Sequence, residues 1–494
     1  MAKDTAIYGL SSIVGRFLNW LLVPLYTIVF SQTQYGIVTF VYAVVAIALI
    51  VLTYGMETGF FRFANHERWH DPMQVYATAL VSLAMSSAAF VALVLAFLPQ
   101  VTVWMECGSH TSYVWMMAVC VAIDAFTALP FSYLRFRKRP VRFAVIRLVN
   151  IGINIGLNLF FILLCPWLMK IAPSSVDWFY DPSFGIGYIF LSNLVASVVT
   201  MALLLPELHG FRYTFCTPLW REMICYSAPL LLLGIAGIMN QTLDKIIFPS
   251  LYKGPDTMAQ LGIYGANYKI AILMVMFIQA FRFAYEPFIF AQNKEKGDDR
   301  IKAYSDAMKF FVIMGICIFL GVMFYLDIIK YFISPKYFSG LKVVPIVMLA
   351  EFFFGILFNL SVWYKLSDKT IWGAWISLIG LVITIVMNVL LVPRFGYMGC
   401  AWAAFTCYFL MMVVSYAVGQ KYYPIAYPLR RIALYTCTAA VIYVLGMYVL
   451  LTPWAAANYA IRTLLLCVML HIVGRREHIT LKALTHPIIS KVKK

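Results

Sequence analysis

Long hydrophobic runs follow one another along almost the whole chain and are separated by short polar connections. Most runs reach the roughly 20 residues that a helix needs to cross a hydrocarbon core about 30 Å thick. No long segment alternates apolar and polar residues, which argues against a transmembrane β-barrel. The pattern predicts an all-α polytopic membrane protein with about fourteen spans, near residues 6–30, 36–60, 76–98, 111–134, 142–165, 184–205, 225–250, 262–290, 308–326, 343–364, 371–392, 396–419, 431–451 and 455–474.

The composition agrees with a membrane protein. Hydrophobic residues make up 63% of the 494 positions and charged residues 12%, whereas soluble domains carry roughly 45–50% and 25%. The first run contains Arg16 and leads directly into the second without a small-residue cleavage site, so we interpret it as a retained span rather than a signal peptide. The 10 Cys lack any spacing suited to zinc. We therefore expect packed thiols, no metal and no cofactor.

The net charge of +17 is concentrated in alternate connections. One basic cluster lies between the fourth and fifth spans and consists of Arg135, Arg137, Lys138, Arg139 and Arg142. The connections 31–35, 99–110 and 452–454 contain no Lys or Arg. By the positive-inside rule this bias predicts that both termini are cytoplasmic, with a basic tail at 475–494. Membrane lipids with anionic headgroups are the expected neighbours of these residues, and nucleic acid is not an expected partner.

Two pairs of short segments suggest an internal repeat. YGIVTFVYA at 35–43 matches LGIYGANYK at 261–269, and FGIGYIF at 184–190 matches FGYMGCA at 395–401. Parallel repeats of this kind are a transporter plan in which the substrate site lies between two lobes. We expect the following parts: lobes at 1–205 and 225–419, a cytoplasmic linker at 206–224, and an appended pair of spans at 431–474. Chance is the alternative, because Gly, Ile and Tyr are abundant here.

The order and spacing of three segments resemble a known family. FGYMGCAWAAF after Pro393, QAFRFAYEPF at 279–288 and the YGIVTFVYA opening are similar to oligosaccharide flippases of the polysaccharide transporter branch of the multidrug/oligosaccharidyl-lipid/polysaccharide (MOP) exporter superfamily. The resemblance covers essentially the whole chain, including the span count. It implies that a lipid-linked oligosaccharide, carried on undecaprenyl pyrophosphate, moves from the cytoplasmic to the periplasmic leaflet of a bacterial inner membrane. Two lobes would alternate access to a central cavity.

Polar side chains within the early spans are the first candidate site residues, because each costs a few kcal/mol in the membrane. Arg16 and Asn19 lie on one face of the first span, and Arg147, Asn150 and Asn154 lie on one face of the fifth. A guanidinium binds phosphate through two hydrogen bonds and stays charged, so we expect Arg16 to contact the pyrophosphate and Arg147 to support it. The alternatives are an ion pair of Arg16 with an acid such as Glu57 or Asp124, and asparagines that bind another helix rather than sugar.

Later spans add Lys245, Lys269 and Arg282 as candidate substrate-binding cations, although Arg282 has an acid, Glu286, four residues away. Asp244 and Lys245 are adjacent, and we expect them to point in different directions and not to pair. Carboxylates at membrane depth can exchange a proton or hold Na⁺, so Asp124 and Glu351 are the candidates for coupling to H⁺ or Na⁺. Each could instead only neutralise an arginine.

Three functions follow from these observations. The first is the lipid-linked oligosaccharide flippase, serving O-antigen, capsule or exopolysaccharide synthesis. A lipid II flippase of peptidoglycan synthesis has the same headgroup chemistry, and a drug or cation antiporter of the MATE type would need a more acidic site. An enzyme is not expected, because the loops are short, and the P-loop pattern GxxxxGK[ST] of nucleotide-driven proteins is absent.

Overall fold

A computed structural model describes residues 2–65, 69, 71–108, 110–210, 212, 214–292, 298–367, 369–450 and 452–477. Within these ranges the chain forms helices and connecting segments, with no β-strand. Thirteen helices of this described part are long and apolar enough to cross a membrane, and a shorter apolar helix, Ile13–Val29, occupies the first predicted span. The predicted all-α polytopic fold is therefore confirmed.

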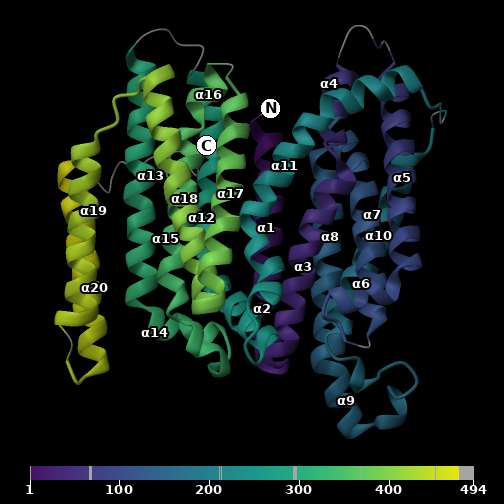
Figure 1. The fold of residues 1–494 in the computed structure, drawn as a ribbon, viewed down its shortest axis with the longest axis horizontal. Helices are drawn as coiled ribbons and strands as arrows, with labels where there is room; N and C mark the ends of the chain where they lie inside the picture. Colours follow the sequence, from purple (N-terminus) through teal and green to yellow (C-terminus); the bar gives the residue numbers. More distant parts are fainter. Residues whose placement is uncertain are drawn as a thin grey trace, which may run out of the picture. The chain divides into compact units, whose positions relative to one another are not determined.

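The first part of the chain folds into α1 (Ala2–Trp20), α2 (Val23–Val29), α3 (Gln32–Thr53), α4 (Met56–Ala64), α5 (Pro72–Ala96), α6 (Leu98–Trp104), α7 (Thr111–Phe136), α8 (Pro140–Leu159), α9 (Cys165–Ile171) and α10 (Gly187–Leu204) (Figure 1). The remainder folds into α11 (Thr217–Leu251), α12 (Thr257–Gln292), α13 (Asp298–Phe324), α14 (Leu326–Ile329), α15 (Val343–Leu360), α16 (Val362–Leu366), α17 (Ile371–Phe395), α18 (Tyr397–Tyr422), α19 (Leu429–Val444) and α20 (Ala455–Arg476).

The chain divides into two compact units. Unit 1 consists of Met1–Lys269, Lys336–Gly340 and Ala374–Cys407, and unit 2 consists of Ile270–Pro335, Leu341–Gly373 and Tyr408–Lys494. The division passes through α12, α17 and α18, so each of these helices contributes to both units. The predicted lobes, 1–205 and 225–419, have different bounds, and the division into lobes stays a prediction.

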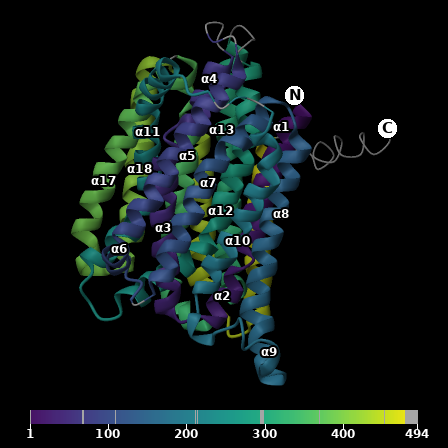
Figure 2. The same ribbon diagram turned by 90° about the vertical axis from the view of Figure 1, so that its right-hand side faces the viewer.

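Prolines interrupt two of the predicted spans. Pro24 lies at the start of α2, where it has no N–H to donate to the preceding turn, and α1 ends at Trp20. Pro166 likewise cannot donate an α-helical hydrogen bond, and residues Phe160–Leu164 before it form a π-helix in which Cys165 N–H donates to the Phe160 carbonyl. The chain then continues in the direction of α8 as α9, beyond the predicted end of the fifth span (Figure 2).

Helices α3 and α4 form one span with a sharp turn. Tyr54 and Gly55 both have left-handed backbone, with φ of 31° and 72°, a conformation that glycine adopts without strain. Ser227 of α11 donates a hydrogen bond of 3.4 Å to the Gly55 carbonyl. The turn directs α4 against α5 and α7, where Phe60 and Tyr76 are completely buried.

In unit 2, α13, α19 and α20 lie side by side (Figure 1). At one end they meet in the Glu477 cluster, where the Glu477 carboxylate accepts Lys309 Nζ at 2.6 Å and Tyr435 Oη at 2.7 Å. Burial opposes ionisation of Glu477, but the hydrogen bonds from Lys309 and Tyr435 and the charges of Lys309 and Arg431 outweigh it, so the pKa of this carboxyl lies below its usual value. The cluster fixes the appended helices to α13.

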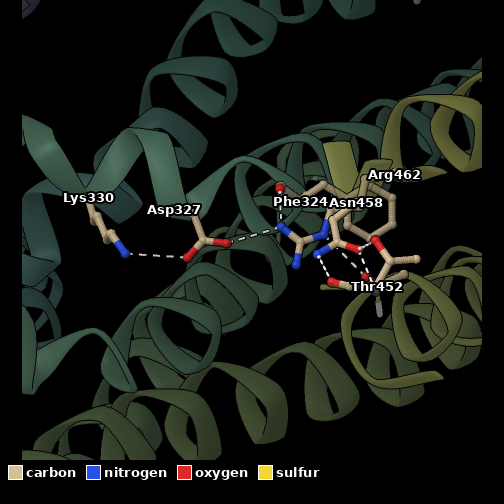
Figure 3. Close-up of polar contacts among 7 residues, drawn as sticks. Phe324, Asp327, Lys330, Thr452, Asn458 and Arg462 are labelled. Carbon is tan, nitrogen blue, oxygen red and sulfur yellow. Dashed lines mark hydrogen bonds and ion pairs between the residues drawn. The ribbon is translucent and has the colours of Figure 1, made fainter. Parts of the chain in front are cut away.

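At the other end of α13, a second group of polar contacts, the Arg462 cluster, also fixes the appended helices to α13 (Figure 3). Arg462 Nη1 donates to the Phe324 carbonyl at 3.0 Å and to Asp327 at 3.1 Å. Its Nε donates at 3.2 Å to the carbonyl of Gly446, which lies in the π-helix Leu445–Val449. Arg462 is therefore a structural cation, because it supplies donors to backbone carbonyls at a helix end and in a π-helix.

The topology of the connections is a testable prediction. In a variant without native cysteines, Ser174→Cys should react with a membrane-impermeant maleimide from the periplasm, whereas Lys138→Cys should react only after the membrane is opened, because basic connections stay cytoplasmic. Both side chains are exposed, so the reagent can reach them. Reversed reactivity at the two positions would contradict the predicted orientation.

Candidate functional site

The two polar stripes of the early spans lie at one helix junction in unit 1. Gly15 lets α1 approach α8 so closely that a Cβ there would lie 2.6 Å from Ile151 Cδ1. Across this junction Asn154 Nδ2 donates to Asn19 Oδ1 at 3.4 Å. Arg16 and Asn19 are exposed. The predicted stripes on the first and fifth spans are thus neighbours.

The asparagines of α8 bind other helices. Asn158 donates to the Asn154 side chain at 3.0 Å and accepts a hydrogen bond of 2.9 Å from the Tyr26 hydroxyl of α2. Asn150 donates to Thr200 Oγ1 of α10 at 2.8 Å. Interhelical bonds of this kind are a usual packing device in membranes, which favours the packing interpretation for these amides. Sugar contact through Asn19, Asn150 and Asn154 stays a prediction.

Arg147 is held by an aromatic ring. Its guanidinium carbon lies 4.1 Å from the centre of the Phe131 ring of α7, an attractive cation–π arrangement. The side chain is nevertheless exposed. The carboxylates of Asp124 and Glu57 lie within electrostatic range of it. Stacking occupies the face of a guanidinium and leaves its N–H edge available to a planar or tetrahedral anion.

Asp124 lies in a polar cluster between α7 and α10. It accepts a hydrogen bond of 2.7 Å from Ser197 Oγ, and Cys120 Sγ lies 3.9 Å from its other oxygen. Hydroxyl donors of this kind stabilise a carboxylate, and Arg147 adds a positive charge nearby. The arrangement can hold a charged carboxylate or accept a proton.

A second charged group in unit 1 was not predicted from the sequence. Glu57 Oε2 accepts hydrogen bonds from Arg135 Nη2 at 2.7 Å and from Ser132 Oγ at 3.0 Å. The side chains of Glu57 and Arg135 are each 38% exposed. The sequence suggested Glu57 as an acid for Arg16, while Arg135 was assigned only to topology. The spacing of Ser132 and Arg135, three residues apart at the end of a helix, was the available signal.

The expectation that Asp244 and Lys245 do not pair is wrong. Lys245 Nζ lies 3.1 Å from Asp244 Oδ1 and donates to the Gln241 carbonyl at 3.0 Å, because the long lysine chain folds back along α11. The amine also lies 4.4 Å from the centre of the Tyr268 ring, and Tyr264 donates to Asp244 at 2.7 Å. This pair is buried, and its role in binding the pyrophosphate stays a prediction.

The remaining candidates are divided between the units. Lys269 belongs to unit 1, where its carbonyl accepts Trp20 Nε1 at 2.7 Å. Arg282 and Glu351 belong to unit 2. The guanidinium carbon of Arg282 lies 4.6 Å from the Phe358 ring centre, and Glu351 is buried. The side chain of Glu286, the alternative partner of Arg282, lies outside the described residues.

Among the residues with described positions, no group of three or more His, Cys, Asp or Glu could hold a metal ion. Buried amides form a further polar group, of which the sequence had indicated Asn240 but not Asn388. Asn240 donates to the Ser377 carbonyl at 3.0 Å, and Asn388 is fully buried on α17. The spacing of Thr384 and Asn388, four residues apart on one face, was the signal for this polar group.

Comparison with known proteins gives a family match and solved structures with a similar fold. Residues 1–291 match the family described as polysaccharide biosynthesis protein. A search of curated proteins finds no match. A solved structure of the lipid II flippase MurJ in an inward closed conformation aligns with 14% identity and a TM-score of 0.74, covering 96% of this chain and 99% of that chain. An inward-facing multidrug resistance MATE family transporter of the MOP superfamily aligns with 12% identity and a TM-score of 0.65, covering 88% and 99%.

At these identities the two structures establish the shared fold, and the family match covers more than half of the chain. The fold is the one found in MATE and MurJ, as the resemblance of the sequence to MOP exporters implied. The chain is therefore a member of the polysaccharide biosynthesis protein family, with the fold of MOP superfamily transporters.

Proposed function

We propose that the protein is a flippase that moves undecaprenyl-pyrophosphate-linked oligosaccharide from the cytoplasmic to the periplasmic leaflet of a bacterial inner membrane. Alternating access to a central cavity would carry the cargo, for O-antigen, capsule or exopolysaccharide synthesis. The observation that carries this proposal is the exposed side chain of Arg147 within a membrane helix, with its guanidinium carbon over the Phe131 ring. An arginine exposed at this depth is costly against lipid chains, so it suits a surface that water or an anionic cargo contacts.

The chemistry of the cargo fits this arrangement. A diphosphate that leaves water must exchange its hydration for fixed hydrogen-bond donors and positive charge. A guanidinium supplies both in a rigid fork, whereas an ammonium acts as a point charge. Arg147 presents such a fork with its orientation limited by the Phe131 ring, and Arg16 is exposed on the neighbouring helix. The nearby acids Asp124 and Glu57 keep the site from being purely cationic.

Complementation in three tester strains distinguishes the candidate functions. We expect expression of the chain to restore surface polysaccharide in a strain that lacks its oligosaccharide flippase. We expect no rescue of growth after depletion of the lipid II flippase and no gain in drug resistance. Rescue of peptidoglycan synthesis alone would support the lipid II alternative, which the structural similarity to MurJ favours. Drug resistance alone would support the antiporter.

Coupling to an ion gradient is tested at Asp124. If this carboxylate exchanges H⁺ or holds Na⁺, Asp124→Asn should keep the Ser197 hydrogen bond and lower gradient-driven transport by about tenfold or more. Transport into vesicles with and without an imposed H⁺ or Na⁺ gradient provides the measurement. Glu351→Gln is the matched variant in unit 2. Unchanged gradient dependence in Asp124→Asn, together with its loss in Glu351→Gln, would assign coupling to Glu351 instead.

A further inference from the structure

We propose that the segment Lys336–Gly340 is a strap that holds the junction of α2 and α3 against α12, and that it must detach before cargo can leave at this end. The junction lies at the end of the helices that is predicted to be periplasmic. The direction of release rests on the proposed function. The attachment itself rests only on contacts within unit 1.

The strap binds the backbone where α2 ends and α3 begins. Lys336 Nζ donates to the Phe30 carbonyl at 2.6 Å, and the Tyr337 hydroxyl lies 3.3 Å from the same oxygen and 3.2 Å from the Ser31 carbonyl. In return, Gln32 Nε2 donates to the Lys336 carbonyl. The last carbonyls of a helix lack intrahelical partners and carry partial negative charge, so a lysine is a suitable group to bind them.

The other side of the strap is fixed to helices from the later part of the chain. Asn267 Nδ2 of α12 donates to the Tyr337 carbonyl at 2.9 Å. The Tyr397 hydroxyl of α18 donates to the Ser339 carbonyl at 3.1 Å. Tyr337 is completely buried between these groups. The strap therefore bridges the start of the first predicted repeat and two helices of the second.

Beneath the strap, α3 and α12 cross with backbone against backbone. A Cβ at Gly36 would lie 1.8 Å from the Met258 carbonyl oxygen, and a Cβ at Gly262 would lie 2.0 Å from the Gln32 carbonyl oxygen. Gln32 precedes Gly36 by the same interval as Met258 precedes Gly262, so the contact is reciprocal. It involves the glycines that the sequence repeat matched to each other, as expected where two related copies meet at a two-fold axis.

These contacts differ in kind from those that fix α19 and α20. The Arg462 and Glu477 clusters contain ion pairs in which at least one charged side chain is buried, and removing one partner of such a pair is strongly unfavourable. At the strap, Lys336 is exposed and its acceptor is a neutral carbonyl, so water can replace the bond. The crossing glycines have no side chains to interdigitate. Separating the strap junction therefore costs less free energy than breaking either of the two clusters.

Cysteine cross-linking tests the strap in a variant without native cysteines, with a bifunctional methanethiosulfonate reagent that spans the distance left by the shorter cysteine side chains. Gln32→Cys with Lys336→Cys should be cross-linked by this reagent, which should stop cargo movement reversibly, with activity restored by reductant. The matched control is Ser339→Cys with Tyr397→Cys, which joins the strap to α18 within the second predicted repeat. We expect this control to cross-link and to retain transport. Full transport in the cross-linked Gln32–Lys336 pair would overturn the proposal.

A second readout does not depend on cargo. Thr39 lies against Gly265 within the crossing, and Thr39→Cys should be protected from a periplasmic, membrane-impermeant maleimide. Adding Lys336→Met and Tyr337→Phe should increase its labelling rate by about tenfold, because the two side-chain donors that bind the strap to the Phe30 and Ser31 carbonyls are lost. If the labelling rate does not change, the strap does not control this end, whatever the cargo. If labelling changes but no polysaccharide moves in any variant, the proposed function fails and the strap stands.

Discussion

Replacing Arg16 with alanine is expected to abolish complementation of a flippase-deficient strain while the protein remains folded at normal abundance. Arg16 is exposed on α1, next to the contact of Asn19 with α8, so its removal creates no internal void. The loss would fall on the diphosphate, which requires fixed cations when its hydration is removed. Surface polysaccharide and membrane abundance of the variant are the two measurements.

Two further variants separate a role in binding from a structural one. Arg16→Lys should recover only part of the activity, because an ammonium lacks the two-point geometry of a guanidinium. Arg462→Ala is the opposite control: this side chain is buried and binds Phe324 and Asp327, so we expect loss of folded protein. Normal transport by Arg16→Ala at normal abundance would refute the assigned role. Loss of abundance, rescued by neutralising an acid, would indicate a structural ion pair.

Replacing Gly262 with alanine is expected to lower the thermal stability of the purified protein by several degrees. The new Cβ would lie 2.0 Å from the Gln32 carbonyl oxygen, and a backbone atom cannot rotate away as a side chain can. Overpacking of this kind costs about 1–3 kcal/mol or more. Gly36→Ala should lower the thermal stability by a similar amount, because its Cβ would meet the same crossing from α3.

The control for this pair is Gly237→Ala on α11, where a Cβ would meet no atom within 4 Å. Alanine is favoured over glycine in a helix by about 1 kcal/mol, so this variant should be neutral or slightly more stable. The three variants are compared by heating each one in detergent and measuring by size-exclusion chromatography how much protein stays folded. Equal stability of all three would mean that the crossing relaxes without cost, and the reciprocal backbone contact would then lose its importance.

The fold could be predicted because a bilayer imposes one length on every span. Hydrophobic runs therefore locate the helices without any knowledge of their partners. Pro24 and Pro166 mark two of the interruptions, and their missing N–H groups were visible in the sequence. The sequence could not show that the chain beyond Pro166 continues as a helix, because this depends on how the π-helix redistributes the hydrogen bonds.

The candidate site was only partly predictable, because its contacts join distant residues. Helical spacing placed Asn19 and Asn154 on polar faces, but only the packed helices bring those faces together. The prediction for Asp244 and Lys245 failed for a different reason. Adjacent Cβ atoms on a helix point in different directions, but the long and flexible lysine side chain can fold back to reach its neighbour. The strap contact of Lys336 with Phe30 has no local signal at all.

The Glu477 cluster has a consequence for biogenesis. Lys309 enters the membrane when α13 is synthesised, yet Glu477 follows α20 and is translated much later. A ribosome-bound intermediate therefore holds Lys309 with only the local carboxylate of Asp306, three residues away. Arg462 and Asp327 are likewise separated by five helices, α15 to α19. Final assembly of α13 must wait until α20 and Glu477 have been synthesised, and a nonsense mutation within α20 would release a chain whose buried lysine lacks its Glu477 partner, for quality-control proteolysis.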